Sequence, residues 1–177
     1  MTVEWNSYDP YVPPVLGPLH ELPRKLALEA YEHLMLSKRE RLEKLRGLLE
    51  ANGVEWGRDN AAIQRLNDWF RGNVECAGDN PNRLRNIWYA VVNDVALLLG
   101  DIIIERSPRV HWEMFIAGKR DVAYQRHVLV GFTKAPNPRF NVDIDRLVAT
   151  YASQVASGLP VSPDYFVTTV RAAVSKA

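Results

Sequence analysis

A long apolar segment, residues 91–105, constrains the fold of this chain more than any other feature. Its sequence is VVNDVALLLGDIIIE, and two carboxylates, Asp94 and Asp101, interrupt it seven residues apart. When residues 83–105 are projected as a helix, apolar side chains fall on nearly every side. Such a helix is stable in water only where other elements cover it. The segment therefore predicts a central, buried helix, although the β-branched residues at 102–104 would also allow strand at its end.

Four other segments carry the three- and four-residue apolar spacing of amphipathic helices. Proline in the first turn, side-chain oxygens at the start and glycine at the end mark their boundaries. We expect these helices at 23–52, from Asp59 or Asn60 to Gly72, from Asn141 to Gly158, and from Ser162 onward.

Between the third and fourth helices the apolar period drops to two. Residues 110–116 and 122–132 alternate in this way on either side of the sequence AGKR, which predicts an antiparallel β-hairpin. Residues 76–82 (CAGDNPN) predict a loop, and the prolines of residues 1–18 predict an extended arm. The expected fold is thus an arm at 1–18 followed by a single α+β domain at 19–177. That domain is mostly helical, with about five helices and a hairpin packed on the central helix.

Composition excludes several classes of protein. The net charge of +1 gives no basic excess of the kind that nucleic-acid binders show. One cysteine, Cys76, can form neither an internal disulfide nor a multi-thiolate zinc site. The first residues lack the basic and apolar regions of a signal peptide, and we expect the interrupted apolar segment to be too short and too polar to cross a bilayer. A cytoplasmic protein without nucleic-acid or membrane partners is therefore expected.

The two carboxylates of the central helix have a structural and a catalytic interpretation. Their spacing places them on one helix face, about 10 Å apart. The favoured interpretation is that each accepts hydrogen bonds from a buried donor, for which Arg85, Tyr89, Arg126 and Arg146 are candidates. The alternative is a small hydrolase or transferase that uses Asp94 or Asp101 with Arg126 or His127, which requires these groups to meet in an open pocket.

Sequence motifs add little support for catalysis. The four histidines lack H-x-x-x-H spacing, and neither a phosphate-binding loop nor a G-x-S-x-G motif occurs. We therefore predict no metal site and no cofactor. The basic run SKRERLEKLR (37–46) contains Glu40 and Glu43 at helical spacing, which favours a solvated, salt-bridged helix face over a nucleic-acid patch.

The hairpin region is rich in residue types that protein interfaces favour. Its candidate binding residues are Trp112, Phe115, Tyr124 and Arg126. The alternative is that one face of the hairpin packs on the central helix while the other is an ordinary polar exterior.

The segments WYAVVNDVALLLGDIIIE and HWEMF, followed by a hairpin and NPRFNVDIDRLVATYA, resemble an uncharacterised bacterial family of small α+β proteins with a helix-Gly-acid-strand-Trp module. The resemblance covers roughly residues 60–157 and extends distantly to immunity-like proteins, which bind and neutralise a toxin. It implies structural roles for Trp88, Asp94, Gly100, Asp101, Trp112 and Glu113, and it carries over no catalytic residue.

The leading hypothesis is accordingly a non-enzymatic cytosolic protein-binding module, with an immunity protein that neutralises a bacterial toxin as its specific form. Besides the enzyme alternative, the aromatic N-terminal arm allows a structural accessory subunit. No oligomeric state is predicted.

Overall fold

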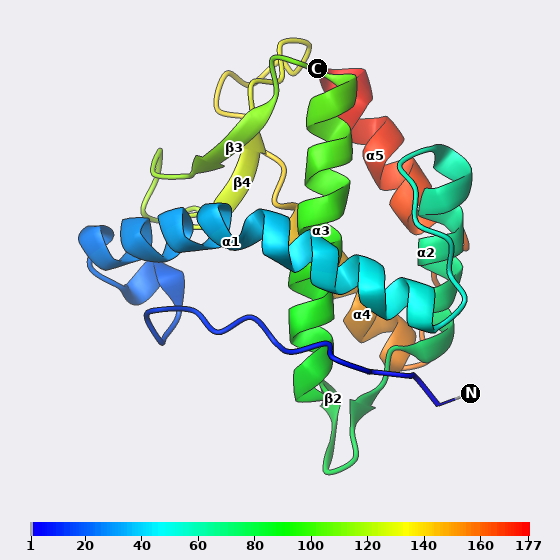
Figure 1. Cartoon of the computed structure of the whole chain (residues 1–177). Coiled ribbons are helices and arrows are strands. Elements are labelled where there is room, and N and C mark those ends of the chain that lie inside the picture. Colours follow the sequence, from blue (N-terminus) through cyan, green and yellow to red (C-terminus); the bar gives the residue numbers. More distant parts are fainter. Residues whose placement is uncertain (1) are drawn as a thin grey trace.

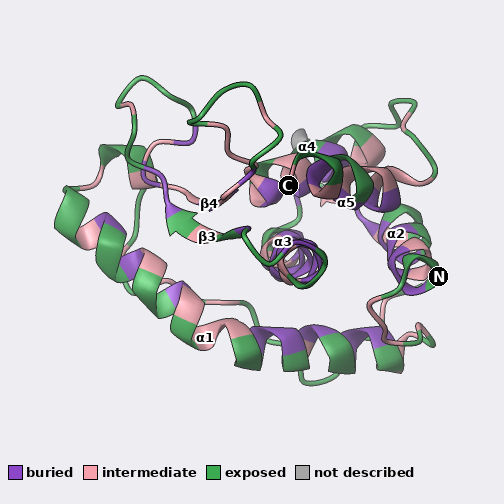
Figure 2. Ribbon diagram, turned by 90° about the horizontal axis from the view of Figure 1, so that it is seen from above, coloured by how far each residue is buried: buried purple, intermediate pink, exposed green. Residues whose placement is uncertain are grey.

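Helix α3 (Asn86–Arg106) runs through the middle of the molecule, and the other elements surround it (Figures 1 and 2). This arrangement is seen in a computed structural model, which describes residues 2–177 apart from the side chains of Pro81 and Asn82. Thirteen of the 21 residues of α3 are buried, and in the view along its axis burial extends around most of the helix. Residues 102–104 are helical, so the strand alternative for the end of this segment is wrong.

Four helices and two small antiparallel sheets complete the fold. The helices are α1 (Arg24–Ala51), α2 (Asn60–Asn73), α4 (Ile144–Ala156) and α5 (Tyr165–Lys176), with a short 3-10 turn, η1 (Leu19–Glu21). One sheet pairs β1 (Cys76–Ala77) with β2 (Asn80–Leu84), and the other pairs β3 (His111–Met114) with β4 (His127–Val130). The predicted α+β, mostly helical fold is confirmed. Helix α1 crosses α3 on one side, while α4 and α5 pack on the other (Figure 2).

The burial of α3 decides between a core helix and a membrane span. By length and composition alone the helix could cross a bilayer, since an 18-residue window within it has a mean hydropathy of 1.8. The prediction that this segment is too short and too polar was therefore wrong. However, 72% of that window is buried inside the fold, as in the core helix of a soluble protein.

The hairpins differ from the sequence prediction in two places. Strand β4 begins at His127 rather than at residue 122, because residues 118–126 form consecutive turns held by bonds such as Tyr124 N to Asp121 O. Gln125 has a left-handed backbone (φ 61°), which ends the apparent alternation before the strand starts. The segment predicted as a loop at 76–82 is instead part of the β1–β2 hairpin.

Helix starts follow side-chain capping only in part. Asp59 caps α2 by accepting a hydrogen bond from the backbone N–H of Ala62, as predicted. For α4 the cap is Asp143, which accepts from the N–H of Arg146, and not Asn141. Helix α5 begins after Asp164 without a side-chain cap, so the prediction for Ser162 was also wrong.

The N-terminal arm lies along the helical body in an extended path (Figure 1). Residues 2–18 contain neither helix nor strand. Its aromatic side chains nevertheless reach the core: Tyr8 is buried, and the ring of Trp5 packs edge-on against Trp88, with centroids 5.4 Å apart. These contacts bring the arm beside both α1 and α3, where the first candidate site lies.

Candidate functional site

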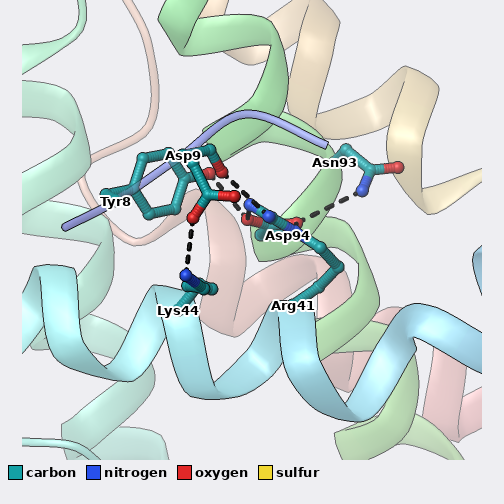
Figure 3. Close-up of polar contacts among 6 residues, drawn as sticks. All are labelled: Tyr8, Asp9, Arg41, Lys44, Asn93 and Asp94. Atoms are coloured by element: carbon teal, nitrogen blue, oxygen red, sulfur yellow. Dashed lines mark hydrogen bonds and ion pairs between the residues drawn. The ribbon is translucent and has the colours of Figure 1, made fainter. Parts of the chain in front are cut away.

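The carboxylate of Asp94 is held in a buried cluster that joins the arm, α1 and α3 (Figure 3). The side chain of Arg41 donates from Nε to Oδ1 (3.0 Å) and from Nη2 to Oδ2 (2.6 Å), and the hydroxyl of Tyr8 donates to Oδ2 (2.6 Å). Asn93 adds a longer bond from Nδ2 to Oδ1 (3.3 Å). Donors therefore meet both oxygens, the arrangement that suits an ionised, acceptor-only carboxylate.

Burial sets the electrostatics of this cluster. Asp94 is 0% exposed and Arg41 is 3% exposed. Desolvation raises the pKa of Asp94, while the hydrogen bonds from Arg41 and Tyr8 oppose that rise. Desolvation lowers the pKa of Arg41, whereas its hydrogen bonds to Asp94 raise it. The pKa of Arg41 ends above its ordinary value, so the guanidinium stays charged. Burial and the adjacent carboxylate raise the pKa of Tyr8, which keeps its hydroxyl protonated as a donor.

The arm seals the cluster. Arg41 donates from Nη1 to the backbone carbonyl of Asp9 (2.8 Å), and its Cζ lies 5.4 Å from the centre of the Tyr8 ring. Lys44, one turn further along α1, pairs with the carboxylate of Asp9 at 2.7 Å. With its charges paired and its solvent access closed, the cluster fastens the arm to the helices.

The second carboxylate, Asp101, belongs to a different cluster. Its Oδ1 accepts a hydrogen bond from Lys38 Nζ (2.6 Å) and one from the indole N–H of Trp112 (3.1 Å). The hydroxyl of Tyr31 donates to the backbone carbonyl of Trp112 at 3.0 Å. This cluster joins α1, α3 and β3, and within it Lys38 pairs with Asp101, both side chains being mostly buried.

Arg126 and His127 have a third set of neighbours. The guanidinium of Arg126 bonds Asp143 Oδ2 (2.5 Å) and Asp145 Oδ2 (2.7 Å) at the start of α4. His127 Nε2 is buried without a hydrogen-bond partner among the described residues, and its ring centroid is 6.1 Å from that of Trp112. Burial lowers the pKa of His127. The hydrogen bonds of Asp94, Asp101 and Arg126 thus go to three different sets of partners, and Trp112, a partner of Asp101, also lies beside the ring of His127.

The donors proposed for the two carboxylates were wrong. Arg85 bonds Glu75, Tyr89 accepts from Leu84 N, and the side chain of Arg126 bonds the start of α4. The charged donors to the two carboxylates, Arg41 and Lys38, come from the run 37–46, which was expected to be a solvated face. A usable signal was present for Arg41, since it lies at helical spacing with buried Leu34, Leu45 and Leu48. Tyr8, in an aperiodic arm, has no comparable signal.

The four candidate binding residues also make internal contacts. Phe115 is buried, Tyr124 and Trp112 are partly buried, and Arg126 is bound to two carboxylates. Across the β3–β4 hairpin His111 pairs with Val130 and His127 with Met114, so the two histidines are not cross-strand neighbours. Within the described part of the chain, no three histidine, cysteine or acidic side chains gather as metal ligands.

A hollow of the surface lies elsewhere, between α4, α5 and the segments that flank β4. We call it the α4–α5 groove; its volume is about 620 Å³. Its walls are largely apolar, with Val122, Ala123, Phe140, Leu147, Ala172 and Ala173 among its lining residues. Four charged residues, Asp121, Asp143, Arg146 and Lys176, also line it. An apolar hollow with a few charged groups is the usual form of a small-molecule site, and apolar surface rimmed by polar residues also marks protein-binding sites.

Comparisons of this chain with known protein families, with curated protein sequences and with solved structures each returned no match.

Proposed function

We propose that this chain is a non-enzymatic protein-binding module and that its binding surface is the α4–α5 groove. The observation that carries the proposal is this apolar hollow of about 620 Å³, beside which Val122 is 67% exposed. When a partner covers apolar surface of this kind, the free energy of the system falls, which favours binding. The alternative enzyme would need Asp94 or Asp101 to meet Arg126 or His127 in an open pocket, whereas the hydrogen bonds of Asp94, Asp101 and Arg126 tie these three side chains to different elements.

A capture experiment with two matched variants tests the proposal. Ala172 is exposed on α5 and lines the groove, so Ala172→Glu places a charge on the binding surface without disturbing the core. Ala61→Glu makes the same change at an exposed position of α2, outside the groove lining. We expect a stoichiometric protein partner to co-purify from the native cells with the wild-type chain and with Ala61→Glu, but not with Ala172→Glu. A partner retained by Ala172→Glu, or no stoichiometric partner at all, would contradict the proposal.

The narrower hypothesis of an immunity protein stays a prediction, since no comparison bears on it. It is tested by co-expressing the chain with the toxin encoded beside it, where one exists, and scoring growth. Rescue by the wild-type chain and by Ala61→Glu, but not by Ala172→Glu, is the expected result.

A cytoplasmic location is also proposed. It is supported by the burial of the apolar helix α3 and by the single cysteine, Cys76, which needs no oxidising compartment. Fractionation of cells that produce the tagged chain should recover it with the soluble cytoplasmic proteins.

A further inference from the structure

The α4–α5 groove continues into a second hollow beneath the segment that links β3 to β4. The second hollow has a volume of about 510 Å³ and shares Asp121, Phe140 and Asn141 with the first. Two exposed apolar side chains, Ile116 and Val122, belong to the same linking segment. Together the two hollows, here called the extended groove, form a surface long enough for more than one side chain of a partner.

The charges along the extended groove are mainly positive. Arg120 and Arg139 line the second hollow, and Arg146 and Lys176 line the first. All four are exposed, and none forms an ion pair with any residue that the structure describes. The acids of the lining are already engaged: Asp143 is bonded to Arg126, and Asp121 accepts a hydrogen bond from the N–H of Ala123.

The near-neutral charge of the whole chain conceals this asymmetry. Residues 107–177 hold nine lysines and arginines against five aspartates and glutamates, whereas residues 1–106 hold 13 against 16. The positive excess therefore lies in the part of the chain that builds the extended groove. An unpaired cation on a surface attracts an anionic partner and favours its approach in the matching orientation.

We propose that the extended groove binds an acidic segment of a partner protein. Apolar side chains of that segment enter the α4–α5 groove, and its carboxylates face Arg120, Arg139, Arg146 and Lys176. This inference rests on the proposed protein-binding function and names the chemistry of the partner. A nucleic acid fits the surface less well, since base stacking requires exposed aromatic platforms, whereas Phe115 and Phe140, the aromatic residues that line the extended groove, are buried and half-buried.

An unbiased peptide selection tests the chemistry of the partner. The full chain is immobilised and used to select from a displayed library of random dodecapeptides. The recovered sequences are then synthesised with a fluorescent label and titrated by anisotropy. We expect peptides enriched in aspartate and glutamate around leucine or aromatic residues, whose affinity falls as salt is raised.

Charge reversal then locates the peptide. Arg146→Glu and Lys176→Glu should each weaken binding of a selected acidic peptide about five- to tenfold, the scale of one exposed charge contact reversed in sign. Arg171→Glu is the matched control, since Arg171 is exposed on α5 but does not line the groove. It should change the affinity by less than about twofold. Acidic peptides that bind all three variants as they bind the wild type would overturn the inference.

Other outcomes separate this inference from the proposal on which it rests. Selected peptides that are neutral or basic, yet lose binding in Ala172→Glu, would overturn the acidic partner and leave the groove as a protein-binding surface. Peptides that bind irrespective of Ala172→Glu would overturn both. A labelled single-stranded RNA that binds through Arg146 and Lys176, with no peptide recovered, would replace the protein partner by a nucleic acid.

Discussion

The indole ring of Trp112 lies directly against the α-carbon of Gly100. A methyl group added to Gly100 would stand 2.0 Å from Cζ2 of that ring, far inside van der Waals contact. The glycine lets β3 approach α3 closely enough for the Trp112 N–H to reach Asp101 Oδ1 at 3.1 Å. Gly100 and Asp101 of the helix and Trp112 of the strand thus form one contact between α3 and β3.

Gly100→Ala should destabilise the protein although alanine favours helix. The clash with Trp112 is an overpacking defect of about 1–3 kcal/mol, which exceeds the roughly 0.5–1 kcal/mol that alanine gains over glycine within a helix. Gly47→Ala is the control: Gly47 is exposed within α1, and an added methyl group meets no atom within 4 Å. It should stabilise the protein by the helix-propensity gain of about 0.5–1 kcal/mol. Urea unfolding measures both, and two changes of the same sign would contradict the explanation.

Removing the buried carboxylate of Asp94 should be among the most damaging single changes. Asp94→Ala leaves Arg41 charged, buried and unpaired, so we expect a loss of about 3–5 kcal/mol in the free energy of unfolding. Asp9→Ala removes the carboxylate that pairs with Lys44 at the surface and should cost less than about 1 kcal/mol. Chemical denaturation measures the loss of stability in both variants. Equal losses would show that the buried charge of Arg41 does not need Asp94 as its partner.

The double variant Arg41→Met with Asp94→Leu tests whether the ion pair itself is needed. Apolar residues of similar size leave no buried charge, so we expect the double variant to be more stable than Asp94→Ala by at least about 1 kcal/mol. A folded double variant that lost partner binding would instead give the Arg41–Asp94 pair a role in binding. Unfolding followed by circular dichroism measures the stability of each variant, and the capture assay measures partner binding.

The arm should be fastened mainly by the hydroxyl of Tyr8. Tyr8→Phe removes a donor to a charged, buried acceptor, and we expect a loss of about 1.5–3 kcal/mol. Tyr11→Phe is the matched change at a neighbouring aromatic, whose hydroxyl lies 2.9 Å from His33 Nδ1 at the surface. Its loss should stay below about 1 kcal/mol. Should both variants unfold like the wild type, the arm would contribute little to stability, and the accessory-subunit alternative would gain support.

Sequence periodicity predicted the helices because burial repeats along a helix. The predicted 23–52 became α1 at Arg24–Ala51, and the apolar segment became the central helix. Periodicity failed at residues 122–126, where apolar side chains alternate by coincidence along turns set by the backbone of Gln125. The β1–β2 hairpin was missed because its strands have no apolar alternation.

The partners of Asp94 could not be found from local spacing. Arg41 and Tyr8 lie 53 and 86 residues away in the chain, so their contact exists only after α1 and the arm pack on α3. The groove was missed for the same reason, since Val122, Phe140 and Lys176 meet only through the packing of three distant segments. A charged residue inside an apolar stripe, as at Arg41, indicates that a buried partner exists without identifying it.

The imidazole of His127 is half-buried beside the ring of Trp112. Burial lowers its pKa below the ordinary value of 6.5, with Asp145 and Asp143 opposing the shift and Arg126 adding to it. At pH values between the lowered pKa and about 6.5, the imidazole of His127 therefore binds a proton in the unfolded chain but not in the folded chain. Stability from this residue is complete above about pH 6.5 and is lost as the pH falls, by up to about 1.4 kcal/mol per pH unit.

His127→Leu removes the titrating ring, and His20→Gln removes an exposed histidine as the control. Urea unfolding from about pH 7 to about pH 5 should show a smaller loss of stability in His127→Leu than in the wild type, while His20→Gln follows the wild type. The slope is compared rather than the stability at one pH, because the leucine also removes the unpartnered Nε2 and changes the packing against Trp112. Equal slopes of stability against pH in all three proteins would mean that His127 takes up its proton over the same pH range in the folded and the unfolded chain, and would contradict the lowered pKa.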